Sequence, residues 1–234
     1  MGDRELEPSE VGAIIVAAGI SHRMGGVDKL FAPVDGRPLL SYVLDVFEAS
    51  PAVSRIVIVL SKRNLVPGQK LVAQGGYLKI KNICLGGEFR QDSVAEGLKY
   101  LVGCEWVVVH DGARPCLTVR LIERGLKEAK VSGAACAAVP ATDTIKVVGS
   151  DGMVLQTLQR DSLYLAQTPQ VFRFDIISEA HHQAKAKLTD DAALVESLGY
   201  KVKAYPGSYE NIKVTTGQEL ALVETILRQR KVGL

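Results

Sequence analysis

The chain has 234 residues, 47% of them hydrophobic and 23% charged, a composition typical of a folded globular protein that excludes disordered and collagen-like chains. Its 28 Lys and Arg residues against 26 Asp and Glu residues leave a net charge of +2, so no broad field would draw it to nucleic acid or an acidic membrane. Any anion that it binds must therefore meet a local site.

The cysteines and the N-terminus indicate a cytoplasmic protein. The four cysteines show neither a C-x-x-C pair nor a metal-finger spacing, so we expect free thiols in a reducing compartment. The first ten residues are acidic and polar, and no apolar run approaches the roughly 18 residues that span a bilayer. We expect a soluble, cytoplasmic chain without a membrane segment.

The first half of the chain alternates predicted strands and helices. Val11–Ala17 is a β-branched run that ends before Gly19, which indicates a strand buried on both faces. A helical apolar period then follows Pro38, and Arg55–Leu60 is a second buried strand. These elements form one strand–helix–strand unit.

The same pattern repeats further along the chain, with a helix at Asp92–Leu101, a strand at Glu105–His110 and a helix at Thr118–Lys130 capped by Thr118. Such alternation predicts an α/β fold with a doubly wound, mostly parallel sheet. No repeat or linker divides the chain, so residues 1–234 are expected to form a single domain.

A projecting β-arm is expected at about residues 141–165. After a strand at AACAAVP, the segments DTIKVV and MVLQTL flank GSDG as in an antiparallel hairpin. Apolar strand edges in such an arm need a cover, and a second copy of the chain would supply one, so we expect a homodimer through the arm. The C-terminal part is predicted to contain helices at Phe174–Lys187, Asp190–Leu198 and Gly217–Arg230, with a strand at Lys201–Tyr205.

Three loops after predicted strands contain residues suited to bind phosphate. The segment from Ala17 to Lys29 combines small residues with Arg23 and Lys29, and its backbone N–H groups can approach an anion. It matches neither G-x-G-x-x-G nor the GK[ST] phosphate loop, which disfavours a dehydrogenase and a common NTPase. A surface loop with two solvated cations remains the alternative.

The second and third loops are GGEFRQDS (86–93) and HDGARP (110–115). Arg90 and Ser93 at a helix start can hold a base or phosphate, although a simple turn and helix cap would look the same. Asp111 and Arg114 follow a strand at the edge where open α/β sheets bind ligands, and a structural salt bridge is the alternative there. The histidines show no ligand spacing, and no metal site made by protein residues is predicted.

The ordered motifs AAG-x-S-x-RM, GGEFRQDS, HDGARP, DTIK, RD-x-L-x-x-AQTPQ, TDDA and NIKVT resemble those of the 2-C-methyl-D-erythritol 4-phosphate cytidylyltransferases from about Val11 to the last helix. The resemblance implies a Rossmann-like nucleotidyltransferase fold and a homodimer that uses Mg2+, bound mainly through the CTP phosphates. It also implies transfer of CMP from CTP to methylerythritol phosphate, with release of pyrophosphate, in non-mevalonate isoprenoid synthesis.

The resemblance also implies roles for individual residues. The catalytic cations would be Arg23, Lys29 and Lys213. The CTP site would comprise Ala17, Ala18, Gly19, Gly87, Glu88, Arg90 and Ser93. The sugar-phosphate site would comprise Asp111, Arg114, Thr144, Arg160 and Thr168, with Arg160 reaching the neighbouring subunit.

Three alternatives remain at the level of sequence. Asp28-Lys29-Leu30 stands where the family usually has Pro-Lys-Gln, and D-K-L also resembles molybdenum-cofactor guanylyltransferases. Cytidylyltransferases acting on ribitol 5-phosphate or another alditol phosphate share nearly all of these motifs. A catalytically silent nucleotide-binding protein is the third alternative.

Overall fold

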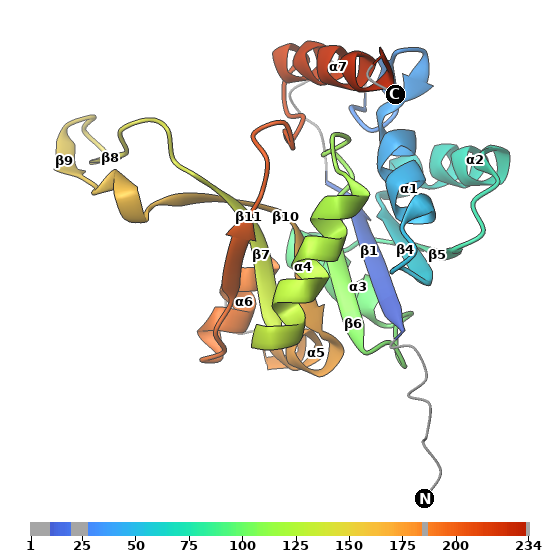
Figure 1. The fold of residues 1–234 in the computed structure, drawn as a ribbon, viewed down its shortest axis with the longest axis horizontal. Helices are drawn as coiled ribbons and strands as arrows, with labels where there is room; N and C mark the ends of the chain where they lie inside the picture. Colours follow the sequence, from blue (N-terminus) through green and yellow to red (C-terminus); the bar gives the residue numbers. More distant parts are fainter. Residues whose placement is uncertain (1–9, 20–27, 184–186, 233–234) are drawn as a thin grey trace, which may run out of the picture.

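The computed structural model describes residues 10–19, 28–183 and 187–232 (Figure 1). Its centre is a seven-stranded sheet in the order β11-β7-β10-β6-β1-β4-β5. The strands are β1 (Val11–Ala17), β4 (Arg55–Leu60), β5 (Ile80–Leu85), β6 (Trp106–Asp111), β7 (Ala134–Pro140), β10 (Tyr164–Arg173) and β11 (Lys203–Pro206). Only β10 runs antiparallel to its neighbours in this sheet, so the predicted mostly parallel α/β sheet is confirmed.

Helices cover both faces of the sheet (Figure 1). The apolar side chains of α1 (Leu39–Ala49) and α4 (Val119–Ser132) pack on one face, and partly buried side chains of α2 (Leu65–Gly75) add to it. The other face is covered by α3 (Arg90–Leu98), α5 (Phe174–Gln183) and α6 (Asp191–Ser197). Because side chains alternate along a strand, Ile15 of β1 joins the first core and Ile14 the second.

The last helix, α7 (Gly217–Val232), lies apart from these two layers. Its Val223 and Leu227 pack with Leu39 and Tyr42 of α1 and with Val34 of the short strand β2 (Pro33–Val34). β2 pairs with β3 (Arg37–Pro38). The contact holds the chain near the start of α1 against the C-terminal helix.

The sequence predicted most of these elements, with errors at several ends. The helix expected at Asp92–Leu101 spans Arg90–Leu98. It begins two residues earlier than expected because the Asp92 carboxylate, within the first turn, accepts the backbone N–H of Phe89. The strand expected at Lys201–Tyr205 lies at Lys203–Pro206. The helix expected at Phe174–Lys187 begins at Phe174 and is described as far as Gln183, and Lys187 is not helical.

Two elements of the sheet region were not predicted, α2 and the long strand β10. β10 contains Pro169, a residue that argues against a central strand in sequence reasoning. The structure accommodates it with a register shift between Ala166 and Gln170.

The predicted hairpin is present between β7 and β10. β8 (Lys146–Val148) and β9 (Val154–Thr157) pair antiparallel, the short 3-10 helix η2 (Arg160–Ser162) follows, and the whole segment extends away from the sheet (Figure 1). Both strands expose all of their side chains. Among the described residues, no helix is both long and apolar enough to span a bilayer.

Candidate active site

A cleft of about 380 Å³ opens at the carboxyl ends of β1, β4 and β6. This is the edge of an α/β sheet where ligands bind, because loops from neighbouring parallel strands converge there. The predicted site residues that line it are Ala17, Ala18, Gly19, Lys29, Gly87, Glu88, Arg90, Ser93, Asp111 and Lys213. Segments far apart in the sequence therefore meet in one cleft.

The glycines of the second loop allow two cleft walls to approach each other. A Cβ on Gly86 would collide with the side chains of Ala18 and Ser93, and one on Gly87 would collide with that of Asp92. Ser93 is buried, and its hydroxyl donates to the carbonyl oxygen of Phe89, 3.1 Å away, at the start of α3. The loop after β1 and the first turn of α3 thus form two sides of the same cleft.

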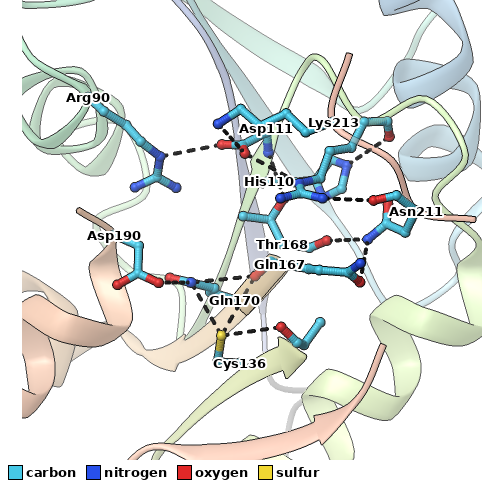
Figure 2. Close-up of polar contacts among 12 residues, drawn as sticks. Arg90, His110, Asp111, Cys136, Gln167, Thr168, Gln170, Asp190, Asn211 and Lys213 are labelled. Carbon is cyan, nitrogen blue, oxygen red and sulfur yellow. Dashed lines mark hydrogen bonds and ion pairs between the residues drawn. The ribbon is translucent and has the colours of Figure 1, made fainter. Parts of the chain in front are cut away.

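Asp111 is the centre of the cation cluster (Figure 2). Its carboxylate lies 2.9 Å from Lys213 Nζ, 3.3 Å from Arg90 Nε and 3.4 Å from Arg114 Nε. Burial alone would raise the pKa of this carboxyl, but the three cations hold the pKa well below its usual range. Asp111 is therefore ionised at neutral pH and fixes three positive side chains around one point.

Lys29 is a further cation of the cleft, close enough to Lys213 and Asp111 to interact with their charges. Burial lowers the pKa of its ammonium group, and the positive charge of Lys213 lowers it further. The carboxylate of the preceding residue, Asp28, accepts the backbone N–H of Leu30 at 3.0 Å and is also bonded by the side-chain amide of Asn64. These two hydrogen bonds to Asp28 restrain the turn that contains Lys29.

A buried hydrogen-bond network behind the cleft holds the Asp111 end of β6 (Figure 2). The backbone N–H of Asp111 donates to Thr168 Oγ1 at 3.0 Å, and Asn211 Nδ2 donates to the carbonyl oxygen of Thr168 at 2.7 Å. Arg114 Nη1 donates to the carbonyl oxygen of Asn211 at 2.7 Å. Arg114 and Thr168 thus lie behind the cleft and act on its geometry through Asp111.

His110, next to Asp111, is fully buried. Burial lowers its pKa to about 4, so the imidazole is neutral at pH 7. Its Nε2 lies 3.2 Å from the carbonyl oxygen of Arg114, which can only accept, so the proton is assigned to Nε2. This contact ties the Arg114 backbone to β6.

Other predicted residues are not brought to the cleft of the same chain. Thr144 and Arg160 lie on the exposed arm, where Arg160 Nη1 donates to the carbonyl oxygen of Thr142 at 2.8 Å. Arg23 lies outside the described residues.

Sequence reasoning missed Ser61, Lys62 and Phe89 in the cleft lining and Asn211 behind it. For Lys62 a signal was present, because it is a cation directly after a buried strand that ends at the ligand-binding edge. Asn211 is the first residue of the quoted motif NIKVT, but its role was not predicted because it depends on a hydrogen bond to Thr168 of β10.

No group of three or more His, Cys, Asp or Glu side chains arranged to hold a metal ion occurs within the described part of the chain. The cleft contains the carboxylates of Glu88 and Asp111. Mg2+ typically binds through one or two carboxylates together with substrate phosphates, so this donor set fits a cation carried by a bound polyphosphate.

Comparison with known proteins points to one family. Residues 11–229 match the family model IspD, 2-C-methyl-D-erythritol 4-phosphate cytidylyltransferase. A 2-C-methyl-D-erythritol 4-phosphate cytidylyltransferase from Dehalococcoides mccartyi is 49% identical over 94% of this chain and 97% of its own length. One from Pelotomaculum thermopropionicum is 45% identical over 95% and 96% of the two chains.

A solved structure supports the same assignment. The 4-diphosphocytidyl-2C-methyl-D-erythritol synthase from Anaerococcus prevotii superposes with a TM-score of 0.83 at 30% identity, covering 94% of this chain and 97% of that one. The matches extend over nearly the whole chain and include both the sheet and the loops of the cleft. The chain belongs to the 2-C-methyl-D-erythritol 4-phosphate cytidylyltransferase family.

Proposed function

We propose that the protein transfers CMP from CTP to 2-C-methyl-D-erythritol 4-phosphate, giving the CDP-alditol and pyrophosphate in non-mevalonate isoprenoid precursor synthesis. The observation that carries this proposal is the cleft at the carboxyl edge of the sheet, which Lys29 lines and in which Lys213 and Arg90 contact Asp111. A phosphate oxygen of the alditol attacks the α-phosphorus, and the bond from that phosphorus to the β-phosphate bridging oxygen breaks. The family and the named relatives favour methylerythritol phosphate over ribitol 5-phosphate.

The reaction requires cations rather than a strong general base. The attacking phosphate is already ionised, so the barrier lies in placing two anions in line and stabilising the charge that grows on the leaving pyrophosphate. Lys29 and Lys213 line the cleft and supply this stabilisation, with Arg23 as a third catalytic cation in the same role. The lowered pKa of Lys29 is consistent with a site that gains an anion on binding.

The nucleotide is expected to occupy the side of the cleft formed by β1 and α3. Ala17, Ala18 and Gly19 offer backbone N–H groups to the phosphates, and Gly87, Glu88, Arg90 and Ser93 form the side for cytosine and ribose. Glycine at position 86 lets these two walls approach each other, since a Cβ there would collide with Ala18 and Ser93.

The sugar phosphate is expected on the side of Asp111. Asp111 lies at the cleft wall, and Arg114 and Thr168 hold it in place. Thr144 and Arg160 lie on the arm, away from their own cleft, so we propose that they serve the neighbouring subunit of a homodimer formed through residues 141–165. The arm exposes apolar side chains, which include Val154 and Leu155, and a dimer would remove them from water.

The divalent cation is proposed to be Mg2+, held mainly by CTP phosphate oxygens and by at most the two cleft carboxylates, Glu88 and Asp111. When bound, it neutralises phosphate charge and polarises the reacting phosphoryl group. We also propose that the protein acts in the cytoplasm, since all four cysteines are buried and free, as expected in a reducing compartment.

Pyrophosphate release tests this function directly. The purified protein is assayed with Mg2+ and each of the four nucleoside triphosphates, crossed with methylerythritol 4-phosphate and ribitol 5-phosphate. Turnover confined to CTP and methylerythritol 4-phosphate is the expected result. Turnover with GTP or with ribitol 5-phosphate alone would overturn the substrate assignment, and no turnover by the folded protein with Mg2+ would favour a silent nucleotide-binding protein.

A further inference from the structure

A line of buried, hydrogen-bonded polar side chains continues from the cleft into the protein beyond Arg90. Arg90 Nη1 donates to Asp191 Oδ2 at 2.6 Å, and His181 Nε2 lies 3.1 Å from Asp191 Oδ1. The side chains of Asp191 and His181 are 1% and 4% exposed, and neither lines the cleft. The line therefore crosses three elements, from α3 through α6 to α5.

Two carboxylates on different elements fix the guanidinium of Arg90. Its Nε lies 3.3 Å from Asp111 at the end of β6, while its Nη1 is bonded to Asp191 at the start of α6. A planar guanidinium held at two of its nitrogens cannot rotate without breaking a charge-assisted hydrogen bond. The remaining nitrogen, Nη2, is buried and has no hydrogen-bond partner among the described residues.

The structure also accounts for the state of Asp191. Burial alone would raise the pKa of its carboxyl, but Arg90 and then His181 lower it below its ordinary value. An ionised carboxylate only accepts, so His181 donates through its Nε2–H. His181 thus satisfies the oxygen of Asp191 that Arg90 leaves free.

The start of α6 is held in place independently of Arg90. Gln170 Nε2 donates to Asp190 Oδ2 at 2.8 Å, and Gln170 Oε1 accepts the backbone N–H of Ala192 at 3.0 Å. Asp190 Oδ1 caps the helix by accepting the N–H of Ala193. Asp191 is therefore a carboxylate presented to Arg90 by a helix end that β10 anchors.

We propose that Asp191 and His181 are positioning residues of the reaction, which hold the guanidinium of Arg90 in place at the wall of the cleft where the nucleotide binds. The inference rests on the proposed function, because it requires Arg90 to contact CTP. Asp191 acts only through Arg90 and touches neither substrate.

Neighbouring aspartates provide a matched comparison. In Asp191→Asn, Arg90 loses one charged partner, and we expect CTP binding measured by calorimetry with Mg2+ to weaken about 10-fold, as for the loss of a hydrogen bond to a charged group. Asp190→Asn loses the bond from Gln170 Nε2, but the asparagine still caps the helix, Gln170 still accepts the N–H of Ala192, and Arg90 is not contacted. CTP affinity should therefore stay within about 2-fold of wild type. Equal loss in the two variants would overturn the proposal.

A second pair of variants keeps the buried carboxylate in case Asp191→Asn does not fold. His181→Phe removes the donor to Asp191 and should weaken CTP binding about 3-fold, whereas His181→Gln retains a side-chain N–H donor and should bind CTP nearly as well as wild type. Identical behaviour of the two would count against a positioning role.

A double-mutant cycle separates positioning from general stability. If Asp191 acts only through Arg90, then Arg90→Met/Asp191→Asn should bind CTP with the same affinity as Arg90→Met alone. Additive losses would show that Asp191 affects the cleft by another route and would overturn the inference. Wild-type protein that turns over no CTP would instead overturn the proposed function, so the two failures are distinguishable.

Discussion

The side-chain amide of Asn64 donates a hydrogen bond to the carboxylate of Asp28, across 36 positions of sequence. The other oxygen of Asp28 accepts the backbone N–H of Leu30, and Asn64 is 2% exposed. The turn that contains Lys29 is thus joined to the 3-10 helix η1 (Lys62–Asn64), directly after β4. Asp28 stands where the cytidylyltransferase family usually has a proline. A proline restrains the backbone through its ring, whereas Asp28 restrains the turn through its two hydrogen bonds.

Asn64→Ala should therefore loosen the turn around Lys29. Removing the donor leaves the Asp28 carboxylate short of a partner, and we expect a loss of about 1–3 kcal/mol in the free energy of unfolding. Turnover should also fall, because Lys29 is less well placed. The check is denaturant unfolding together with steady-state kinetics. In a Lys29→Ala background, Asn64→Ala should lower turnover no further, and an additional loss would contradict this link.

Lys29→Ala should lower kcat about 100-fold or more while changing the affinity for the sugar phosphate far less. The reason is that a preorganised cation stabilises charge that develops only in the transition state. Lys99→Ala is the matched control, since Lys99 pairs with Glu96 on the exposed side of α3. Steady-state kinetics on both variants would test the role, and an unchanged kcat in Lys29→Ala would refute it.

His110 should make the protein less stable as the pH falls from about 6.5 to 4. Its pKa is about 4 in the folded chain because it is buried, against an ordinary value near 6.5, so only the unfolded chain binds the proton in this range. The loss attributable to His110 is roughly 3 kcal/mol. Urea unfolding at several pH values would measure it. His110→Gln should flatten this part of the curve, and His182→Gln, at an exposed position of α5, should not.

Thr168→Val should affect the site without adding or removing charge. The buried backbone N–H of Asp111 donates to the Thr168 hydroxyl, so valine leaves it unpaired at a cost of about 1–3 kcal/mol. We expect lower thermal stability and a higher KM for the sugar phosphate, because Asp111 is no longer fixed. Thr168→Ser keeps the hydroxyl and should remain close to wild type. Equal behaviour of the two variants would show that the methyl group, not the hydrogen bond, matters.

A mixture of Arg160→Ala and Lys29→Ala proteins should recover activity if Arg160 serves the neighbouring subunit. In a mixed dimer one site has its own Lys29 and receives Arg160 from the partner, so free exchange should restore about a quarter of wild-type activity. The measurement is pyrophosphate release before and after mixing, with subunit exchange followed by a fluorescent label. Exchange without recovery would place Arg160 outside the neighbouring site.

Local sequence patterns predicted the elements that their own residues determine. The buried strands Val11–Ala17 and Arg55–Leu60 were predicted with the bounds that the structure shows, because β-branched runs favour extended backbone buried on both faces. β10 was not predicted, since its pairing overrides the local effect of Pro169 by a register shift that depends on β7. Its antiparallel direction likewise depends on its neighbours.

The sequence by itself determined the alternation of strands and helices apart from α2 and β10, the glycine loops at the ends of β1 and β5, and the cations that follow them, because these depend on residue type and short spacing. Only the tertiary structure decided which charges meet. Lys213 and Arg90 converge on Asp111, and Asp191 reaches Arg90 across 101 positions, because the strand order brings their loops to one edge of the sheet. Burial then sets the strength of these contacts, since a charge removed from water is stable only where packing supplies its partner.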